Sequence, residues 1–366
     1  MIRHEVWLTD ERGNRLILLD NIEMFQWTRI VNGIGRCTII LKDDLPEHMI
    51  DIDRRIEIRR APEDKEFNLE NYYFIRRPER DTDQNNINRL TVYSLDPNEL
   101  LKRRIVAYAA GSAQANKTDF IDDMMKEIVY ENLGAGAIAA RDMTGSGFTI
   151  APDAGLGPSI TKSFARRNVL TILQDLSDIA RNEGTEVYFA VVPNGLDFRF
   201  ETYIGQPGLD RTYDTADPII FSLEFGNLLM PTLEEDFEDE VNYVYGGGQG
   251  EGVGRTIVEV NDAVRINRSI WNRREAFRDA RHEATAAGVE DEAQARLAEG
   301  RPKRRFAGIL ISTPTTRYGT DWNLGDRCGI SYAGQQFDGL IRAISGSVNR
   351  EGFERVEARV EVEDVA

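Results

Sequence analysis

Short segments in which apolar and polar residues alternate fill the first 95 residues, and this pattern restricts the possible folds more than any other feature. Alternation with a period of two predicts strands that bury one face. The segments occupy residues 6–8, 16–19, 23–30, 35–41, 55–60, 71–77 and 88–94. Asn32-Gly33, a pair that favours a hairpin turn, separates the third from the fourth. Because short strands joined by turns are typical of a barrel or a sandwich, residues 1–105 are predicted to form a first β-barrel domain.

Residues 106–215 have a different pattern, which predicts a small α+β lobe. Two runs of apolar residues at helical spacing each follow a residue that can cap a helix, Thr118 in one case and Asn168 in the other. Alternating residues on both sides of a Pro-Asn-Gly turn predict a hairpin over 186–203. The glycine- and alanine-rich stretch 134–157 is expected to be an exposed loop.

An acidic stretch that ends in glycines follows this lobe. Its two sets of alternating apolar residues predict two strands: Phe221, Leu223 and Phe225, then Val241, Tyr243 and Tyr245. A phosphate-binding loop would need a Gly-Lys-Ser/Thr ending, whereas the run over 246–254 is followed by Arg255 and Thr256. A flexible loop between two strands is therefore the favoured interpretation.

The rest of the chain predicts helices followed by a return to strands. Ser269 is a plausible helix cap, and Gly288 and Gly300 resemble the ends of two helices. Strands are expected again at 305–312, 329–332, 340–344 and 355–362. We therefore expect a discontinuous second β-barrel domain from residues 216–262 and 303–366, with a helical insertion at 263–302. The predicted class is α+β, mainly β.

The last strands repeat features of the first domain. Asp53-Arg54 corresponds to Asp326-Arg327 at an offset of 273, and Ile75-Arg76 corresponds to Ile341-Arg342 at an offset of 266. The pattern Arg89-Leu90-x-Val92 corresponds to Arg355-Val356-x-Ala358, again at 266. The difference in offset lies in a polar hairpin loop, where a change of length is tolerated. Chance similarity between two β segments is the alternative explanation.

The charge balance excludes some functions. The chain of 366 residues has 45 Lys and Arg against 62 Asp and Glu, a net charge of −17. Stable nucleic-acid binding and attachment to an anionic membrane both need a basic surface. Two distant cysteines, Cys37 and Cys328, give neither a metal-binding spacing nor a disulfide framework. No apolar signal segment or membrane span is visible, so we expect a protein made in the cytoplasm.

No arrangement of residues indicates catalysis. The three histidines, His4, His48 and His282, have no paired spacing. The acidic cluster Glu234–Glu240 could hold Ca²⁺ or act as glycosidase carboxylates, but it lacks the alternation and central glycine of a calcium loop. A solvated acidic segment is favoured. We therefore predict no catalytic, cofactor-binding or metal-binding residues, no cofactor and no enzymatic activity.

Several of these segments resemble the siphophage Gp37-like tail proteins. The residues that carry the resemblance lie at 55–105, 221–229, 241–248 with Arg255, 271–275 and 318–326. The resemblance covers most of the chain, and its motifs are structural.

The resemblance implies a tail-tip or baseplate hub protein in the virion tail. It implies a homotrimer whose two barrels per chain form a pseudo-hexameric ring, which adapts the six-fold tail tube to a three-fold tip and surrounds the exit channel for DNA. The expected neighbours are the tail tube or distal tail protein ring above and tip or fibre proteins below. The chain ends at Ala366 directly after the last strand, so an appended hydrolase or receptor-binding domain is not expected. The alternative is a tail protein that binds or hydrolyses carbohydrate of the cell envelope. Its candidate aromatic contacts are Trp322 and Tyr332, which a place in the barrel core explains equally well.

Overall fold

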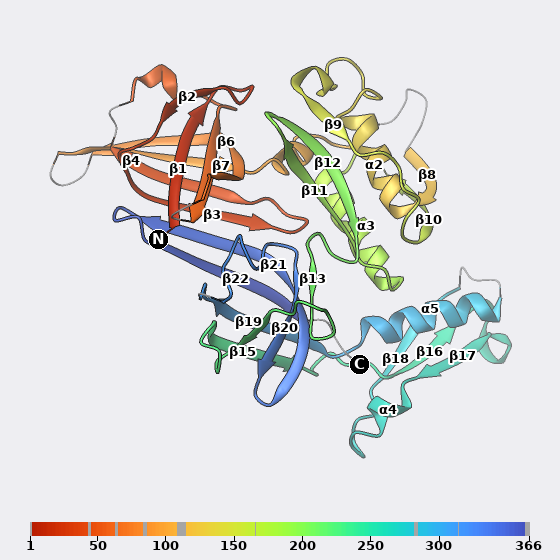
Figure 1. The fold of residues 1–366 in the computed structure, drawn as a ribbon. Coiled ribbons are helices and arrows are strands. Elements are labelled where there is room, and N and C mark those ends of the chain that lie inside the picture. Colours follow the sequence, from red (N-terminus) through yellow and green to blue (C-terminus); the bar gives the residue numbers. More distant parts are fainter. Residues whose placement is uncertain are drawn as a thin grey trace. The chain divides into compact units, whose positions relative to one another are not determined.

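A computed structural model describes residues 2–42, 45–62, 65–82, 86–107, 115–164, 166–281, 285–313 and 315–362. The chain folds into two compact units (Figure 1). Unit 1 contains Met1–Pro231 and Gly308–Glu361, and unit 2 contains Thr232–Ala307. The boundaries fall inside β15 (Leu228–Asp236) and β19 (Lys303–Leu310), which pair with each other as a two-stranded sheet.

A twelve-stranded sheet forms the centre of unit 1, in the order β13-β20-β21-β3-β4-β7-β6-β5-β1-β2, with β14 also on β20 and β22 also on β21. Its strands are β1 (Ile2–Thr9), β2 (Arg15–Leu18), β3 (Ile22–Ile30), β4 (Arg36–Lys42), β5 (Arg55–Pro62), β6 (Asn68–Thr82), β7 (Asn88–Leu95), β13 (Asp210–Arg211), β14 (Ile220–Ser222), β20 (Arg327–Tyr332), β21 (Gln335–Asn349) and β22 (Glu354–Val362). Every strand predicted in the first 95 residues is present. The mainly-β class with some α is therefore confirmed.

The strand order joins the two ends of the chain, because β21 pairs with β3 (Figure 1). Gly346 lies opposite Trp27 in this pairing, and a Cβ atom at that position would come within 2.3 Å of the indole. Glycine is thus required where the two strands meet. Among the described residues the order is open, with β2 and β13 at its ends. One open sheet replaces the two closed barrels that the sequence predicted.

The internal repeat corresponds to two meanders with the same strand order, β7-β6-β5 and β22-β21-β20. Both central strands have 15 residues. Ile75 exchanges backbone hydrogen bonds with the pair Asp53-Arg54 (3.2 and 2.8 Å), and Ile341 does so with Gly325-Asp326 (both 2.9 Å). In the structure Arg54 is therefore equivalent to Asp326, whereas the sequence comparison matched it with Arg327, one residue later. The structure keeps the match of Ile75 with Ile341.

The predicted α+β lobe is also part of unit 1. The helices α2 (Ile121–Asn132) and α3 (Val169–Asn182) pack with the hairpin of β11 (Val187–Asn194) and β12 (Asp197–Ile204) around one apolar core. The strand β9 (Phe148–Ile150) runs parallel to β12, and β8 (Ala115–Phe120) pairs with β10 (Ser159–Phe164). A short α1 (Glu99–Lys102) leads into the lobe.

The two predicted helix caps differ from the structure. Thr118 lies in β8, and Phe120 occupies the N-cap of α2, so that prediction is wrong. Asn168 is the N-cap of α3 as predicted, but its side chain donates to the carbonyls of Lys102 and Arg104 and not to the helix. The side chain of Asn168 therefore attaches the start of α3 to the end of α1 and to Arg104, which follows it.

Part of the glycine-rich stretch 134–157 is held in place by the first turn of α2. The carboxylate of Asp123 accepts hydrogen bonds from the amides of Ala154 and Gly155 (2.8 and 2.9 Å). The carboxylate of Asp122 accepts one from Leu156 (2.6 Å) and contacts the ammonium of Lys126 at 2.9 Å. Buried carboxylates at a helix N-terminus thus fix the end of this stretch. The prediction of an exposed loop is wrong for residues 148–150, because they form β9 and Phe148 is buried.

Unit 2 is a small three-stranded sheet covered by one helix. The central β16 (Tyr243–Gly247) pairs antiparallel with β17 (Ile257–Asn261) and parallel with β18 (Glu275–Asp279). The helix α5 (Ala286–Glu299) packs Ala293 and Leu297 against the sheet. Of the two helices predicted between Ser269 and Gly300, only α5 is present in the part of this segment that the structure describes; the single turn α4 (Ala263–Ile266) precedes it.

The strand β18 overturns the prediction of a first helix between Ser269 and Gly288. Pairing with β16 satisfies its backbone groups and overrides the local helical preference. The strands β16 and β17, which were predicted to belong to the second barrel, lie in unit 2. The predicted loop between them is present and contains a short 3₁₀ turn at Gly252–Gly254.

The predicted strand through Phe225 ends at Ser222. The chain then turns at Gly226, whose φ is +67°, and leaves Leu223 and Phe225 exposed. Phe221 is fully buried against Trp322, with ring centroids 5.6 Å apart. In the described part of the chain, no helix is long and apolar enough to cross a membrane.

Candidate functional site

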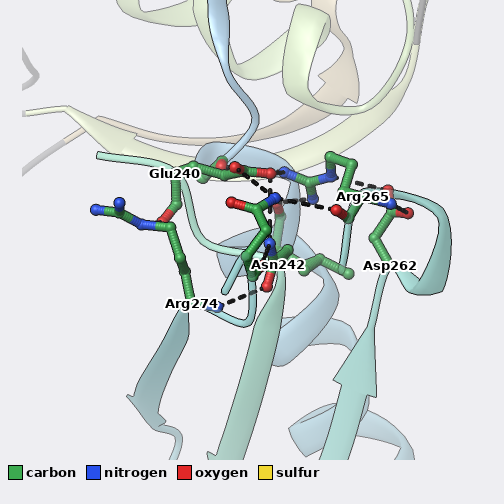
Figure 2. Close-up of polar contacts among 8 residues, drawn as sticks. Glu240, Asn242, Asp262, Arg265 and Arg274 are labelled. Atoms are coloured by element: carbon green, nitrogen blue, oxygen red, sulfur yellow. Dashed lines mark hydrogen bonds and ion pairs between the residues drawn. The ribbon is translucent and has the colours of Figure 1, made fainter. Parts of the chain in front are cut away.

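A buried ion pair lies at one end of the sheet of unit 2, where β16 begins and β17 ends (Figure 2). Glu240 and Arg265 are 4% and 7% exposed, and Nη1 of Arg265 lies 3.5 Å from Oε1 of Glu240. The guanidinium also contacts Asp262, whose Oδ2 accepts from its Nε at 2.9 Å. The other carboxylate oxygen of Asp262 caps α4 by accepting from the amide of Arg265 at 3.0 Å. This amide holds the pKa of Asp262 below its ordinary value.

The guanidinium of Arg265 also caps the C-terminus of α5. Its Nη1 and Nη2 donate to the carbonyls of Gly300 (3.2 Å) and Leu297 (3.4 Å) at the C-terminus of α5. Carbonyls in the last turn of a helix have no partner within the helix, and a cation there also complements the helix dipole. One side chain therefore connects α4, α5 and the segment before β16.

Two asparagines extend the network to the segment 267–274. Asn242 is fully buried; its Oδ1 accepts from the amide of Arg274 (2.8 Å), and its Nδ2 donates to the carbonyl of Asn272 (2.5 Å). The side chain of Asn272 returns two bonds, to Oε2 of Glu240 (3.2 Å) and to the carbonyl of Arg265 (3.0 Å). A satisfied buried network of this kind fixes one conformation of the backbone.

The acidic segment 234–239 leads into this network. Glu234, Glu235, Glu238 and Asp239 are exposed, as the sequence predicted, whereas Glu240 is buried and paired, so the prediction is wrong for that residue. An open depression of about 570 Å³ lies beside them. Its lining mixes acidic residues with Arg274, Arg296 and Arg301. Among the described residues, no group of His, Cys, Asp or Glu could hold a metal ion.

The remaining candidate residues are not brought together. His4 lies in β1, His48 lies in the short 3₁₀ turn Glu47–Met49, and His282 is outside the described residues. Trp322 is fully buried, with its Nε1 donating to the carbonyl of Thr316 at 3.2 Å. Tyr332 is half-buried in β20. Burial of Trp322 excludes it as a surface contact for carbohydrate.

A second buried network, in unit 1, joins the last strand to the first domain. Both carboxylate oxygens of Glu354 accept from the guanidinium of Arg60 (2.7 and 2.6 Å), and Oε1 lies 2.9 Å from Nε2 of His4. Arg60 also donates to the carbonyl of Tyr318 at 2.9 Å. Although burial alone would raise the pKa of Glu354, the hydrogen bonds from Arg60 and His4 outweigh it and lower that pKa to about 2.

Sequence reasoning missed both networks. The spacing of Glu240, Asn242 and Arg265 along the chain does not predict that they contact one another. The pairing of β16 with β17 and β18 brings them together. The repeat found in the sequence comes within one residue of the unit 1 network, because Glu354 immediately precedes Arg355, which is part of the repeat.

Comparisons with known proteins identify the fold. A family model described as Siphovirus ReqiPepy6 Gp37-like protein matches residues 4–360. A 43 kDa tail protein of prophage MuSo2 from Shewanella oneidensis is similar in structure, with a TM-score of 0.61 at 12% identity over 99% of this chain and 100% of that chain. A tail protein from Neisseria meningitidis MC58 gives 0.58 at 13% identity, over 99% and 97%. No curated protein matches this sequence.

A larger assembly contains a similar fold. One chain of a Francisella PdpA–VgrG complex aligns with this chain, with a TM-score of 0.52 at 9% identity. The alignment covers 99% of this chain and 52% of that one.

Proposed function

Because the chain belongs to the family described as Siphovirus ReqiPepy6 Gp37-like protein, we propose that this structural phage tail protein works as a hub at the tail end. In the proposed assembly three copies form a ring around the DNA exit channel. The ring adapts the six-fold tube to a three-fold tip.

The repeated meander is the observation that supports this proposal best. The meanders β7-β6-β5 and β22-β21-β20 have the same strand order and equally long central strands, and Ile75 and Ile341 make the same pair of backbone bonds in each. A chain with two similar surfaces contributes two similar positions to a ring. Three chains then contribute six positions, which is what contact with a six-fold tube requires.

The partners follow from the same arrangement. In the proposed tail, the tube or the distal tail protein ring contacts the six repeated positions, and tip or fibre proteins contact the opposite, three-fold side. The similar fold in the Francisella PdpA–VgrG complex supports a role in an assembly of several proteins. No catalytic step is part of the proposal, in keeping with the structural tail proteins that the chain resembles.

Electron microscopy and sedimentation of the purified protein test the proposal together. We expect particles with three-fold symmetry and a central opening, and a sedimenting mass of three chains. Because a tube end could act as a template, the same measurements should be repeated with the purified tube protein added. A mass of one chain in both conditions, up to the highest soluble concentration, would contradict the ring.

A further inference from the structure

A pair of strands precedes each of the two repeated meanders. The strands β3 and β4 come before β5-β6-β7, and β15 and β19 come before β20-β21-β22. Both β3 and β15 have nine residues. A turn with Asn32-Gly33 joins the first pair, whereas unit 2 is inserted between the strands of the second pair. We call β3–β7 the first set and β15 with β19–β22 the second set, because their strands follow one another in the same order.

Inside one chain, the first set contributes an outer strand to the second set. The strand β3 pairs with β4 on one side and with residues 343–349 of β21 on the other. Along this part of β21, the alternate residues Ile344, Gly346 and Val348 are buried. An edge of the second set is thus covered by a strand from the first set.

The equivalent edge of the first set is exposed. At the repeat offset of 266, residues 343–348 of β21 correspond to residues 77–82 of β6. The pairing of β5 with β6 ends at Phe74, and the strand that pairs with residues 77–82 is β7. All six of these residues are exposed. The edge of a sheet is a place where a further strand can add by backbone hydrogen bonds. We call residues 77–82 the β6 edge.

The strand β15 is equivalent to β3 but lacks its second partner. In the part of the chain that the structure describes, β15 pairs with β19 alone, as a two-stranded ribbon. Two strands by themselves are marginally stable, and a third strand stabilises them. The second set therefore has an outer strand to contribute, and the first set has an edge that can receive it.

We propose that β15 of one copy adds, antiparallel, to the β6 edge of a second copy of this chain. The proposal rests on the ring proposed above and names the contact between its copies. It repeats between chains the contact that β3 makes with β21 inside one chain. Because the two surfaces differ, the contact is heterologous, and heterologous contacts form a ring when the rotation closes. All six sets of three chains are then joined by contacts of one kind.

The register of β3 on β21 specifies the register of β15 on β6. Trp27 lies opposite Gly346. When the nine-residue strands β3 and β15 are aligned end to end, Leu233 takes the place of Trp27, and the repeat offset puts Arg80 in the place of Gly346. Leucine is smaller than tryptophan, so this position between copies does not require a glycine.

Two features make the contact between copies weaker than the contact inside one copy. Pro78 and Pro231 have no N–H to donate, and proline in a strand is typical of an edge. The same register brings Glu79 opposite Glu234, and like charges directly opposite each other destabilise a strand pair. Relief of this repulsion should therefore strengthen the association.

Disulfide cross-linking tests the contact and its register in the 366-residue chain. Directly opposite residues of two strands have Cβ atoms about 4.5–5.5 Å apart, close to the span of a disulfide. We expect Glu79→Cys with Glu234→Cys to give covalent trimers on mild oxidation, both alone and with the purified tube protein. The control is Glu79→Cys with Glu235→Cys, in which the second cysteine points to the opposite face. Wild type controls for Cys37 and Cys328, which are buried.

A mixture of two single variants shows whether the link joins different copies. Glu79→Cys and Glu234→Cys, purified separately and then mixed, should give covalent dimers and no larger species. Circular dichroism melts check that every variant is folded.

Removal of the opposed charges gives a second, independent test. Sedimentation equilibrium should show that Glu79→Gln and Glu234→Gln each tighten association by about threefold per contact. The double variant should tighten it no further than either single change, because each change removes the same repulsion. Within one copy Glu79 lies 3.9 Å from Arg77, an exposed pair of little consequence. Glu183→Gln, at an exposed position at the end of α3, is the control and should associate as wild type.

The outcomes separate this inference from the proposed ring. If wild type forms a three-fold ring but Glu79→Cys with Glu234→Cys does not cross-link, the contact is wrong and the ring stands. If wild type is a single chain both with and without the tube protein, and no cross-link forms, both fail. Equal cross-linking through Glu235→Cys, or additive effects of Glu79→Gln and Glu234→Gln, would overturn the inference by showing that β15 does not pair with β6 in this register.

Discussion

Glu354 is a buried carboxylate whose charge is balanced by Arg60 and His4, two residues from the opposite end of the chain. Its pKa is about 2 in the folded protein, below its ordinary value of 4.5. The folded state thus binds this proton less readily than the unfolded chain does. The stabilisation is complete above the ordinary pKa and disappears as the pH falls toward 2.

We predict that Glu354→Gln lowers the free energy of unfolding at pH 7 by about 3 kcal/mol, since Arg60 then remains buried without its carboxylate partner. Denaturant titrations of wild type and variant from pH 7 to pH 2 measure the difference. It should shrink steadily below about pH 4.5. The control is Glu351→Gln at an exposed position. A difference that stays constant down to pH 2 would show that the charge of Glu354 is not the cause.

Arg265 has a comparable role in unit 2, where it meets Glu240, Asp262 and the end of α5. We predict that Arg265→Leu destabilises unit 2 by about 3–5 kcal/mol, because Glu240 is left buried without its cation. Hydrogen exchange of the β16 amides reports this loss locally. Arg296→Leu is the control, since Arg296 is partly exposed and lies 3.9 Å from Glu299, and it should cost less than about 1 kcal/mol. If the double variant Arg265→Leu with Glu240→Leu regains stability, the unpaired charge of Glu240 is the cause. An equal loss of stability in Arg296→Leu would refute this explanation.

At the scale of elements, α5 packs unusually close to β16. A Cβ atom at Gly246 would lie 2.9 Å from Cγ1 of Val289 and 3.1 Å from Cβ of Ala293. We predict that Gly246→Ala pushes the helix away and costs about 1–3 kcal/mol of unit 2 stability, measured by hydrogen exchange of α5. Gly254→Ala is the matched control, because a Cβ atom there meets nothing within 4 Å. Equal protection of α5 in both variants would be inconsistent with close packing.

The elements that sequence reasoning found and missed differ in a physical way. The strands of the first 95 residues were predictable because each carries its own alternation and is bounded by turn residues, and the β11–β12 hairpin follows the same rule. The strand β18 was missed because its pairing with β16, Tyr243 opposite Glu275, joins residues 32 apart in the chain and is absent from the local pattern. The α2 cap was misplaced because Thr118 belongs to the preceding strand.

The candidate site was less predictable than the fold. Glu240 looked like one more solvated acid in an acidic run, and only the buried Arg265 distinguishes it. Leu223 and Phe225 alternate like strand residues but are exposed beyond the end of β14. Positions at which local patterns and structure disagree are frequently functional, and this exposed turn is one of them.

At the scale of the whole molecule, the net charge bears on the channel of the proposed ring. Three chains carry an excess of 51 negative charges, three times the 17 of one chain. We predict a lumen with more Asp and Glu than Lys and Arg, because phosphate contacts with arginine would slow the passage of DNA. An acidic wall repels DNA within a Debye length of about 8 Å at physiological salt.

A cryo-electron microscopy structure of the ring measures this prediction directly by counting the charged side chains that line the opening. The control is the outer surface of the same particle, where the acidic excess would serve solubility alone. A lumen lined mainly by Lys and Arg, with the acids outside, would refute it.

The pairing of β15 with β19 has a consequence for how such a chain can change over evolutionary time. The chain leaves unit 1 along one of these strands and returns along the other, so unit 2 is inserted at the end of a two-stranded ribbon. A module attached in this way can be exchanged or lost if a short turn reconnects the ribbon, while both meanders stay in the same chain. A tail protein of this kind could thus acquire new contacts by replacing unit 2 without any redesign of the sheet of unit 1.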